Sequence, residues 1–223
     1  MSDSQLGAIF DWDGVVIDSH AQHEKAWFRL AEELGKPLTS AMFVETFGMR
    51  NETILPDFLK WAEPGDHDQI RELGDYKEEL YRDILRETGI EPLPGVLDLL
   101  QQLLDAGIPR AVGSSTSRKN IDTIIEIAGL EGFFNEISAA EDVTEGKPAP
   151  DVFLTAARKI DREPANCVVF EDAHVGIEAG RRAGMKVVGV ATTHPLDSLG
   201  DADIAVESLA GFGLSELRAL LSS

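Results

Sequence analysis

The sequence contains a single cysteine, Cys167, among its 223 residues. One cysteine cannot form an internal disulfide, so a secreted fold held together by disulfides is excluded. No apolar run reaches the roughly 18 residues that a membrane-spanning helix needs, and the first residues lack the basic and apolar regions of a signal peptide. We therefore expect a cytoplasmic protein without a membrane partner.

Basic residues are also scarce, since 20 Lys and Arg stand against 40 Asp and Glu and give a formal net charge of −20. Such a chain has no general basic surface to displace counterions from a nucleic acid, so a nucleic-acid partner is not expected. The rest of the composition, 43% hydrophobic and 27% charged, is that of a globular protein. We expect a monomer, although composition leaves an oligomer open.

Two kinds of pattern divide the chain. A short apolar strand over 6–10 is followed by helices alone, and after about residue 92 strands and helices alternate to the end. Helices are expected over 39–47, 51–62, 68–88, 96–106, 118–128, 151–160 and 175–183, with another after Ser19 and a last one from Leu214. Further strands are expected over 109–113, 136–140, 167–170, 186–190 and 203–206.

This alternation predicts an α/β fold with a Rossmann-like parallel sheet covered by helices on both faces. The stretch of helices after the first strand is too long to be a crossover between two strands. We therefore predict an α-helical cap domain over 18–91, inserted into an α/β core domain formed by 1–17 and 92–223.

Polar residues stand where the predicted strands end, which is where open parallel sheets bind their ligands. They are Asp11 and Asp13, Ser114, Lys147 (which precedes a helix), and Glu171 with Asp172. Carboxylates brought together repel one another unless a cation lies among them, and a set of oxygen ligands suits Mg²⁺. A hydroxyl and a lysine suit a phosphoryl group, and carboxylates can act as a nucleophile or as an acid and base.

Each of these residues also has a simpler explanation. An Asp at the end of a strand is often a turn or helix N-cap residue, and Lys147 could be a solvated loop residue. The residues from Asp11 to Gly14 begin a calcium-loop pattern, although Val15 and the missing final Glu argue against one. All of these positions at strand ends together favour one shared site.

Four segments resemble the ordered motifs of the haloacid dehalogenase-like superfamily. They are Phe10–Val16, Gly113–Ser115, Gly146–Asp151 and Phe170–Asp172. Within that superfamily, the helices before Pro94 resemble the cap of the β-phosphoglucomutase-like group. The resemblance covers nearly the whole chain, and it is specific for the superfamily rather than for a substrate.

The resemblance implies a role for each matching residue. Asp11 would be the nucleophile and a metal ligand. Asp13 would be the general acid and base, and its backbone carbonyl would contact the metal. Ser114 would hydrogen-bond the transferring phosphoryl group, and Lys147 would offset the charge on it.

The last motif implies the cofactor, because Asp172, with Glu171, would hold Mg²⁺. The second Asp of the first motif indicates the branch of the superfamily. Dehalogenases and phosphonate-cleaving enzymes lack an Asp at the position of Asp13, so its presence favours phosphate-ester chemistry.

Substrate specificity would lie in the cap and in the loop after Ser114. The candidate substrate-binding residues are Ser115, Thr116, His23, Trp27, Gly48, Arg50 and Asn51. Trp27 also fits the apolar stripe of its helix, and Arg50 could form a surface ion pair. β-Phosphoglucomutases carry Lys-Gly followed by an Arg on this loop, whereas Phe47 precedes Gly48 here, which puts mutase activity in doubt.

We therefore predict a Mg²⁺-dependent phosphatase that hydrolyses a small phosphorylated metabolite, in the first place a sugar phosphate, through an aspartyl-phosphate. The alternatives left open are a β-phosphoglucomutase-type sugar phosphomutase, an inorganic pyrophosphatase, and a non-catalytic phospho-acceptor or binding protein. A signalling receiver gathers similar residues, but it is a single domain of about 120 residues without a large helical insert.

Overall fold

The computed structural model describes residues 5–46, 49 and 51–222. Its contacts divide the chain into two compact units, one formed by Met1–Asp18 with Ile90–Ser223 and the other by Ser19–Gly89. They are called here the core unit and the inserted unit. The boundaries expected from the sequence, after residues 17 and 91, differ from these by one or two residues.

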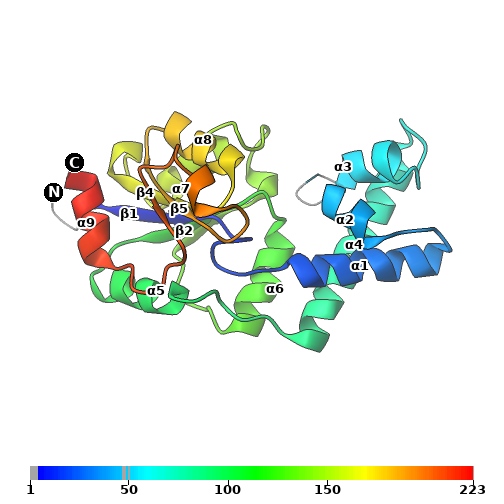
Figure 1. Ribbon diagram of the computed structural model, residues 1–223, viewed down its shortest axis with the longest axis horizontal. Coiled ribbons are helices and arrows are strands. Elements are labelled where there is room, and N and C mark those ends of the chain that lie inside the picture. Colours follow the sequence, from blue (N-terminus) through cyan, green and yellow to red (C-terminus); the bar gives the residue numbers. More distant parts are fainter. Residues whose placement is uncertain (1–4, 47–48, 50, 223) are drawn as a thin grey trace. The chain divides into compact units, whose positions relative to one another are not determined.

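Within the described residues, six parallel strands of the core unit form one sheet in the order β3-β2-β1-β4-β5-β6 (Figure 1). The strands are β1 (Gly7–Phe10), β2 (Arg110–Gly113), β3 (Glu136–Ser138), β4 (Cys167–Glu171), β5 (Lys186–Val190) and β6 (Ile204–Val206). The first strand lies inside the sheet between β2 and β4, so the strand order reverses there. Loops that leave the carboxyl ends of strands at such a point diverge and form a ligand crevice.

Helices cover both faces of this sheet, as an α/β fold requires (Figure 1). They are α5 (Val96–Asp105), α6 (Arg118–Ala128), α7 (Asp151–Lys159), α8 (His174–Arg182) and α9 (Leu214–Ser222), with short 3-10 turns at Ala140–Asp142, Pro164–Asn166 and Leu196–Ser198. The predicted fold class is confirmed, and the expected elements of the core unit begin and end within one or two residues of the observed ones.

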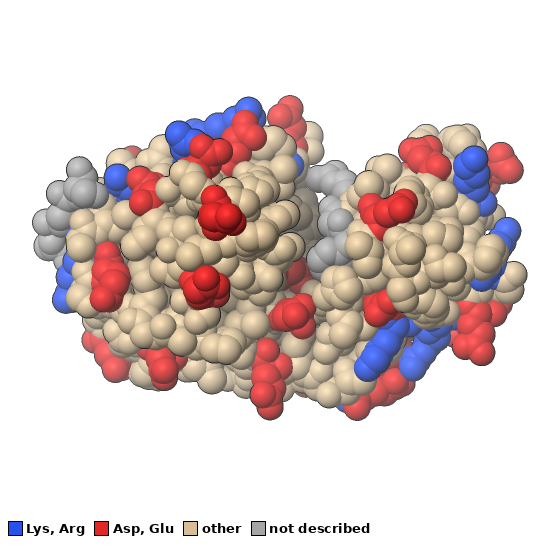
Figure 2. All heavy atoms as spheres, in the orientation of Figure 1, with Lys and Arg blue, Asp and Glu red and all other residues tan. Residues whose placement is uncertain are grey.

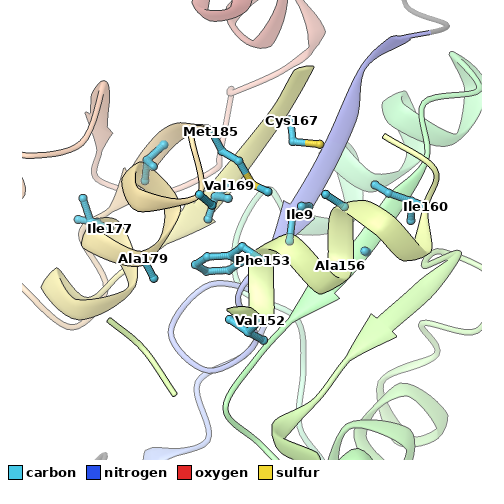
Figure 3. Close-up of a cluster of buried hydrophobic side chains, with 14 of the residues drawn as sticks. Ile9, Val152, Phe153, Ala156, Ile160, Cys167, Val169, Ile177, Ala179 and Met185 are labelled. Carbon is cyan, nitrogen blue, oxygen red and sulfur yellow. The ribbon is translucent and has the colours of Figure 1, made fainter. Parts of the chain in front are cut away.

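The two faces of the sheet carry different side chains because successive residues of a strand point to opposite sides. On one face, Ile9 and Val169 join a buried cluster that contains Phe153 of α7 and Ile177 of α8 (Figure 3). On the other face, the rings of Phe10 and Phe170 stack with their centroids 4.5 Å apart. Burial of these apolar surfaces holds the strands, and therefore their carboxyl ends, in place.

The inserted unit is entirely helical within the described residues. Its helices are α1 (His20–Leu34), α2 (Ser40–Thr46), α3 (Asn51–Thr53), the π-helical turn η2 (Ile54–Phe58) and α4 (His67–Thr88). The helix expected over 51–62 is wrong, because α3 passes into η2 after one turn and no helix continues to 62. Pro56 lacks the N–H group of a regular α-helix, and the chain widens here so that Leu59 N–H donates to Ile54 O at 2.8 Å.

Negative charge is spread over the surface. Figure 2 shows Asp and Glu side chains scattered across the visible faces of both units rather than gathered in one patch. Among the described residues, no helix has the length and apolar character to cross a membrane.

Candidate active site

The residue after β1, Asp11, is held at the centre of the sheet edge. Its backbone N–H donates to Phe170 O of β4 at 2.9 Å, and Asp11 is only 8% exposed. The strand pairing therefore continues one residue past β1 and places the carboxylate beside the end of β4. Parallel pairing alone accounts for this position.

Lys147 joins two of the predicted carboxylates. Its Nζ lies 2.8 Å from Asp11 Oδ1 and 2.6 Å from Glu171 Oε1. The Glu171 side chain is fully buried, and its Oε2 accepts the backbone N–H of Ala173 at 2.7 Å. One lysine thus bridges the ends of β1 and β4, the two strands that flank the reversal in strand order.

The neighbouring Asp172 is oriented by a residue from another loop. The hydroxyl of Thr193, which follows β5, donates to Asp172 Oδ2. The hydrogen bond fixes one carboxylate oxygen of Asp172. A carboxylate oxygen of each of Asp11, Glu171 and Asp172 lies within 4.8 Å of the others.

Two glycines make room for these carboxylates. A Cβ atom at Gly14 would collide with the Asp172 carboxylate, and one at Gly176 would collide with the Glu171 carboxylate. Gly14 also has a φ of +82°, in the left-handed region that other residues seldom adopt. The packing of Glu171 and Asp172 therefore depends on two positions without side chains.

Charge in this group is unbalanced, because three buried carboxylates face one lysine. Burial raises the pKa of Asp11 to about 7, with Lys147 opposing and Glu171 adding to the shift. Burial and the charge of Asp11 raise the pKa of Asp172 to about 6. Burial alone would lower the pKa of Lys147, but the two carboxylates outweigh it and raise that pKa instead.

An excess of buried carboxylate oxygen is what a hard divalent cation requires. The donors are all oxygen, they come from two neighbouring strand ends, and burial together with the charge of a neighbouring carboxylate raises the pKa values of Asp11 and Asp172. The group formed by Asp11, Glu171 and Asp172 therefore fits a divalent cation.

The loop after β2 brings hydroxyl groups to the same edge. Ser114 is buried, and its Oγ accepts the backbone N–H of Thr116 at 3.0 Å. The Thr116 hydroxyl in turn donates to Asp13 Oδ2 at 2.6 Å. Ser115, which the sequence also nominates, is exposed. The structure thus links Ser114, Thr116 and Asp13 directly.

Three of the predicted substrate-binding residues meet inside the inserted unit. His23 Nδ1 accepts from Lys77 Nζ at 2.7 Å, and the same Nζ lies 5.5 Å from the ring centroid of Trp27. Asn51 Nδ2 donates to Glu78 Oε1 at 2.9 Å, and Glu78 also pairs with Lys77 at 2.9 Å. These five residues form what is called here the inserted-unit cluster. The remaining two predictions, Gly48 and Arg50, lie outside the described residues.

Burial and the charges within the inserted-unit cluster together determine which of its side chains are ionised. Burial, and then the charge of Lys77, lower the pKa of His23 well below its usual value, so the ring is neutral. Burial would raise the pKa of Glu78, but the charge of Lys77, helped by the hydrogen bonds from Asn51 and Lys77, outweighs it and lowers that pKa to about 2. One cation and one anion therefore face each other beside a neutral imidazole.

Sequence reasoning missed Thr193, Lys77 and Glu78. Thr193 follows a strand, so the rule applied to the other strand ends would have pointed to it. Lys77 lies on the buried face of α4 with Ile70, Tyr81 and Ile84, and a lysine on an otherwise apolar stripe was the available signal.

Comparison with known proteins finds one hydrolase family and several phosphatases. A family model described as haloacid dehalogenase-like hydrolase matches residues 7–184. The chain is 34% identical over 96% of its length to the chloroplastic 5-amino-6-(5-phospho-D-ribitylamino)uracil phosphatase of Arabidopsis thaliana, and it spans only 57% of that protein. It is 33% identical to the fructose-1-phosphate phosphatase YqaB of Escherichia coli, with 85% of this chain and 98% of that protein covered.

A solved structure shows the same fold. The β-phosphoglucomutase of Clostridium difficile superimposes with a TM-score of 0.82 at 25% identity, with 100% of this chain and 98% of that chain covered. Phosphatases and a mutase thus share this architecture.

Proposed function

Since the chain belongs to the haloacid dehalogenase-like hydrolases, we propose that it is a Mg²⁺-dependent phosphatase that acts on a small phosphorylated metabolite, in the first place a sugar phosphate. The observation that carries the proposal is the bridge from Asp11 through Lys147 to Glu171, with Asp172 beside it. The proposed nucleophile, a cation and the proposed metal ligands thus lie together at one sheet edge. The sugar phosphate rests on the similarity to the fructose-1-phosphate phosphatase.

In the proposed reaction, Asp11 attacks phosphorus and forms an acyl-phosphate bond while the bond to the leaving alkoxide breaks. Asp13 gives its proton to that oxygen, so the alcohol leaves neutral. Asp13 then takes a proton from a water molecule that attacks the phosphoryl group, and inorganic phosphate and the Asp11 carboxylate are released. Thr116 holds Asp13 near this point through its hydroxyl.

The remaining residues would bind the phosphoryl group and the metal ion and offset the negative charge of the phosphoryl group. Ser114 would donate its hydroxyl to a phosphoryl oxygen, and Lys147 would offset negative charge on that group and on Asp11. Asp11, Glu171, Asp172 and the backbone carbonyl of Asp13 would hold Mg²⁺. When bound, Mg²⁺ supplies positive charge that stabilises the phosphoryl oxygens. A cytoplasmic location stays a prediction from the cysteine content.

The inserted unit is proposed to act as the cap. His23, Trp27 and Asn51, which meet around Lys77 and Glu78, would recognise the part of the substrate that is not transferred, together with Gly48, Arg50, Ser115 and Thr116.

A panel of phosphate esters that includes fructose 1-phosphate, together with pyrophosphate, tests the proposal. Phosphate release is measured with Mg²⁺ or EDTA for the wild type, Asp11→Asn and the surface control Asp105→Asn. We expect release that requires Mg²⁺, falls by at least about 10⁴-fold in Asp11→Asn, and is unchanged in Asp105→Asn. Release that survives in Asp11→Asn would refute the assigned nucleophile.

The same panel examines the second candidate, a sugar phosphomutase, which the similarity to a β-phosphoglucomutase supports. Each sugar 1-phosphate is also assayed for its 6-phosphate isomer in the presence of the matching bisphosphate. Isomerisation with negligible phosphate release would favour the mutase.

A further inference from the structure

The helix α6 begins two residues after Thr116, immediately beside the proposed phosphoryl site. Its N-cap residue, Ser117, makes no capping hydrogen bond with its side chain. The N–H groups at the start of a helix carry partial positive charge and attract anions. A second acidic group on a substrate bound at Ser114 would be drawn to this end of α6.

A carboxylate of the protein already takes that position. Both oxygens of Glu141 accept the backbone N–H of Arg118, Oε1 at 3.2 Å and Oε2 at 3.0 Å. The short turn that carries Glu141, Ala140–Asp142, is tied to the active-site loop because Ala140 N–H donates to Thr116 O at 3.1 Å. Glu141 therefore faces the start of α6 from a fixed backbone.

The cation at the first residue of α6, Arg118, is also engaged. Arg118 Nε donates to Asp122 Oδ1 at 2.8 Å within α6. A second phosphate would have to displace Glu141 from the backbone N–H and would meet its negative charge, and Arg118 would have to give up Asp122 to compensate.

We propose that Glu141 is a specificity-determining residue that excludes a second phosphate from the start of α6 and so restricts the enzyme to monophosphates. The inference rests on the proposed phosphatase function, because it assumes that the first phosphoryl group binds beside Asp11 and Ser114. The Glu141 carboxylate would both cap α6 and repel an anion. A variant that removes its charge but keeps an oxygen acceptor separates these two effects.

Glu141→Gln makes that change, and Glu126→Gln makes the same charge change farther along α6, on an exposed residue. All variants carry Asp11→Asn so that bound esters persist. Calorimetry with Mg²⁺ present measures the Kd of fructose 1-phosphate and of fructose 1,6-bisphosphate, which differ by one phosphate. Thermal unfolding of each variant reports on the cap of α6.

We expect Glu141→Gln to tighten binding of the bisphosphate by about tenfold and to leave the Kd of the monophosphate within about twofold, since a like-charge contact is removed. Glu126→Gln should change neither. An equal change in both constants, or none in the bisphosphate, would overturn the inference while the phosphatase proposal stands. Failure of both esters and of inorganic phosphate to bind would overturn the proposed function and this inference together.

Discussion

Each unit of the molecule contains a buried lysine among carboxylates, and the two groups differ in their charge balance. Lys147 in the core unit faces Asp11 and Glu171, with Asp172 close by. Lys77 in the inserted unit pairs with Glu78 and contacts the neutral ring of His23. The first group carries excess negative charge, and the second is neutral overall.

The difference in net charge predicts that the two groups respond differently to a cation. A group with excess negative charge is held together by the packing around it and gains free energy when a cation binds. A neutral group gains no free energy when a cation binds, so we expect the inserted-unit cluster not to respond to Mg²⁺. The predictions below separate these two behaviours, beginning with the largest effect.

Replacement of each lysine by methionine contrasts the two groups directly. Either change removes the lysine that faces a buried or half-buried carboxylate, so each should reduce the free energy of unfolding by about 3–5 kcal/mol. In Lys147→Met, added Mg²⁺ should recover much of the loss, because the crowded carboxylates then bind the cation. In Lys77→Met, Mg²⁺ should recover none of it.

Thermal and denaturant unfolding with Mg²⁺ or EDTA measures both losses. Lys119→Met and Lys25→Met, on exposed residues of the core and inserted units, are the controls and should unfold like the wild type. An equal response to Mg²⁺ in both buried-lysine variants would remove the distinction between the groups.

The pH dependence of stability tests the contribution of the Glu78 ion pair to the inserted unit. Folding lowers the pKa of Glu78 from 4.5 to about 2, so its ion pair contributes fully above pH 4.5 and is lost as the pH falls toward 2. The shift corresponds to about 3 kcal/mol. Relative to the wild type, Glu78→Gln should be destabilised by about this amount at pH 7, and the difference should shrink below pH 4.5.

Urea unfolding of the wild type and Glu78→Gln across this pH range tests the effect. Glu79→Gln changes the next residue of α4, which is exposed, and should show no such dependence. A difference that stays constant down to pH 2 would mean that the carboxylate charge is not what stabilises the cluster.

The smallest expected effect concerns the orientation of a carboxylate in the core unit. Thr193→Val removes the hydroxyl that donates to Asp172, and Mg²⁺ binding should weaken about tenfold, as is typical for the loss of a group that orients a metal ligand. Thr193→Ser should retain the affinity. Calorimetric titration of Mg²⁺ measures it without relying on activity.

The neighbouring exposed residue provides the matched control, Thr192→Val, which should bind Mg²⁺ as the wild type does. Unchanged Mg²⁺ affinity in Thr193→Val would show that packing alone orients Asp172.

The sheet and the charged residues at its edge were accessible from the sequence because both follow from local patterns. Alternating apolar strands and amphipathic helices predict a parallel sheet, and parallel pairing brings Asp11 and Glu171 to one edge. Lys147, which precedes α7, pairs with both in the structure. Contacts between distant residues were not accessible in this way. Nothing local to Arg118 indicates that Glu141 accepts its N–H, and although the strand-end rule marks Thr193, it does not indicate that Thr193 donates to Asp172.

The helices and buried residues of the inserted unit were harder to predict from the sequence for a related reason. Pro56 interrupts a stretch of otherwise helical spacing, and the wider turn that accommodates it depends on how Ile54 and Leu55 are buried. Position 77 lies on the apolar stripe of α4, but a lysine there argues against burial, and the ion pair with Glu78 that permits burial does not follow from periodicity.

Gly14 and Gly176 limit how this site can change in evolution. Neither glycine has a functional group, yet Gly14 leaves the volume that the Asp172 carboxylate fills, and Gly176 leaves the volume that the Glu171 carboxylate fills. A scan that replaces every residue by alanine would therefore place these glycines among the most sensitive positions, beside Asp11 and Lys147. Natural variation at this edge is constrained by volume as well as by charge, because the backbone at Gly14 leaves no room for the longer side chain of Glu in place of Asp172.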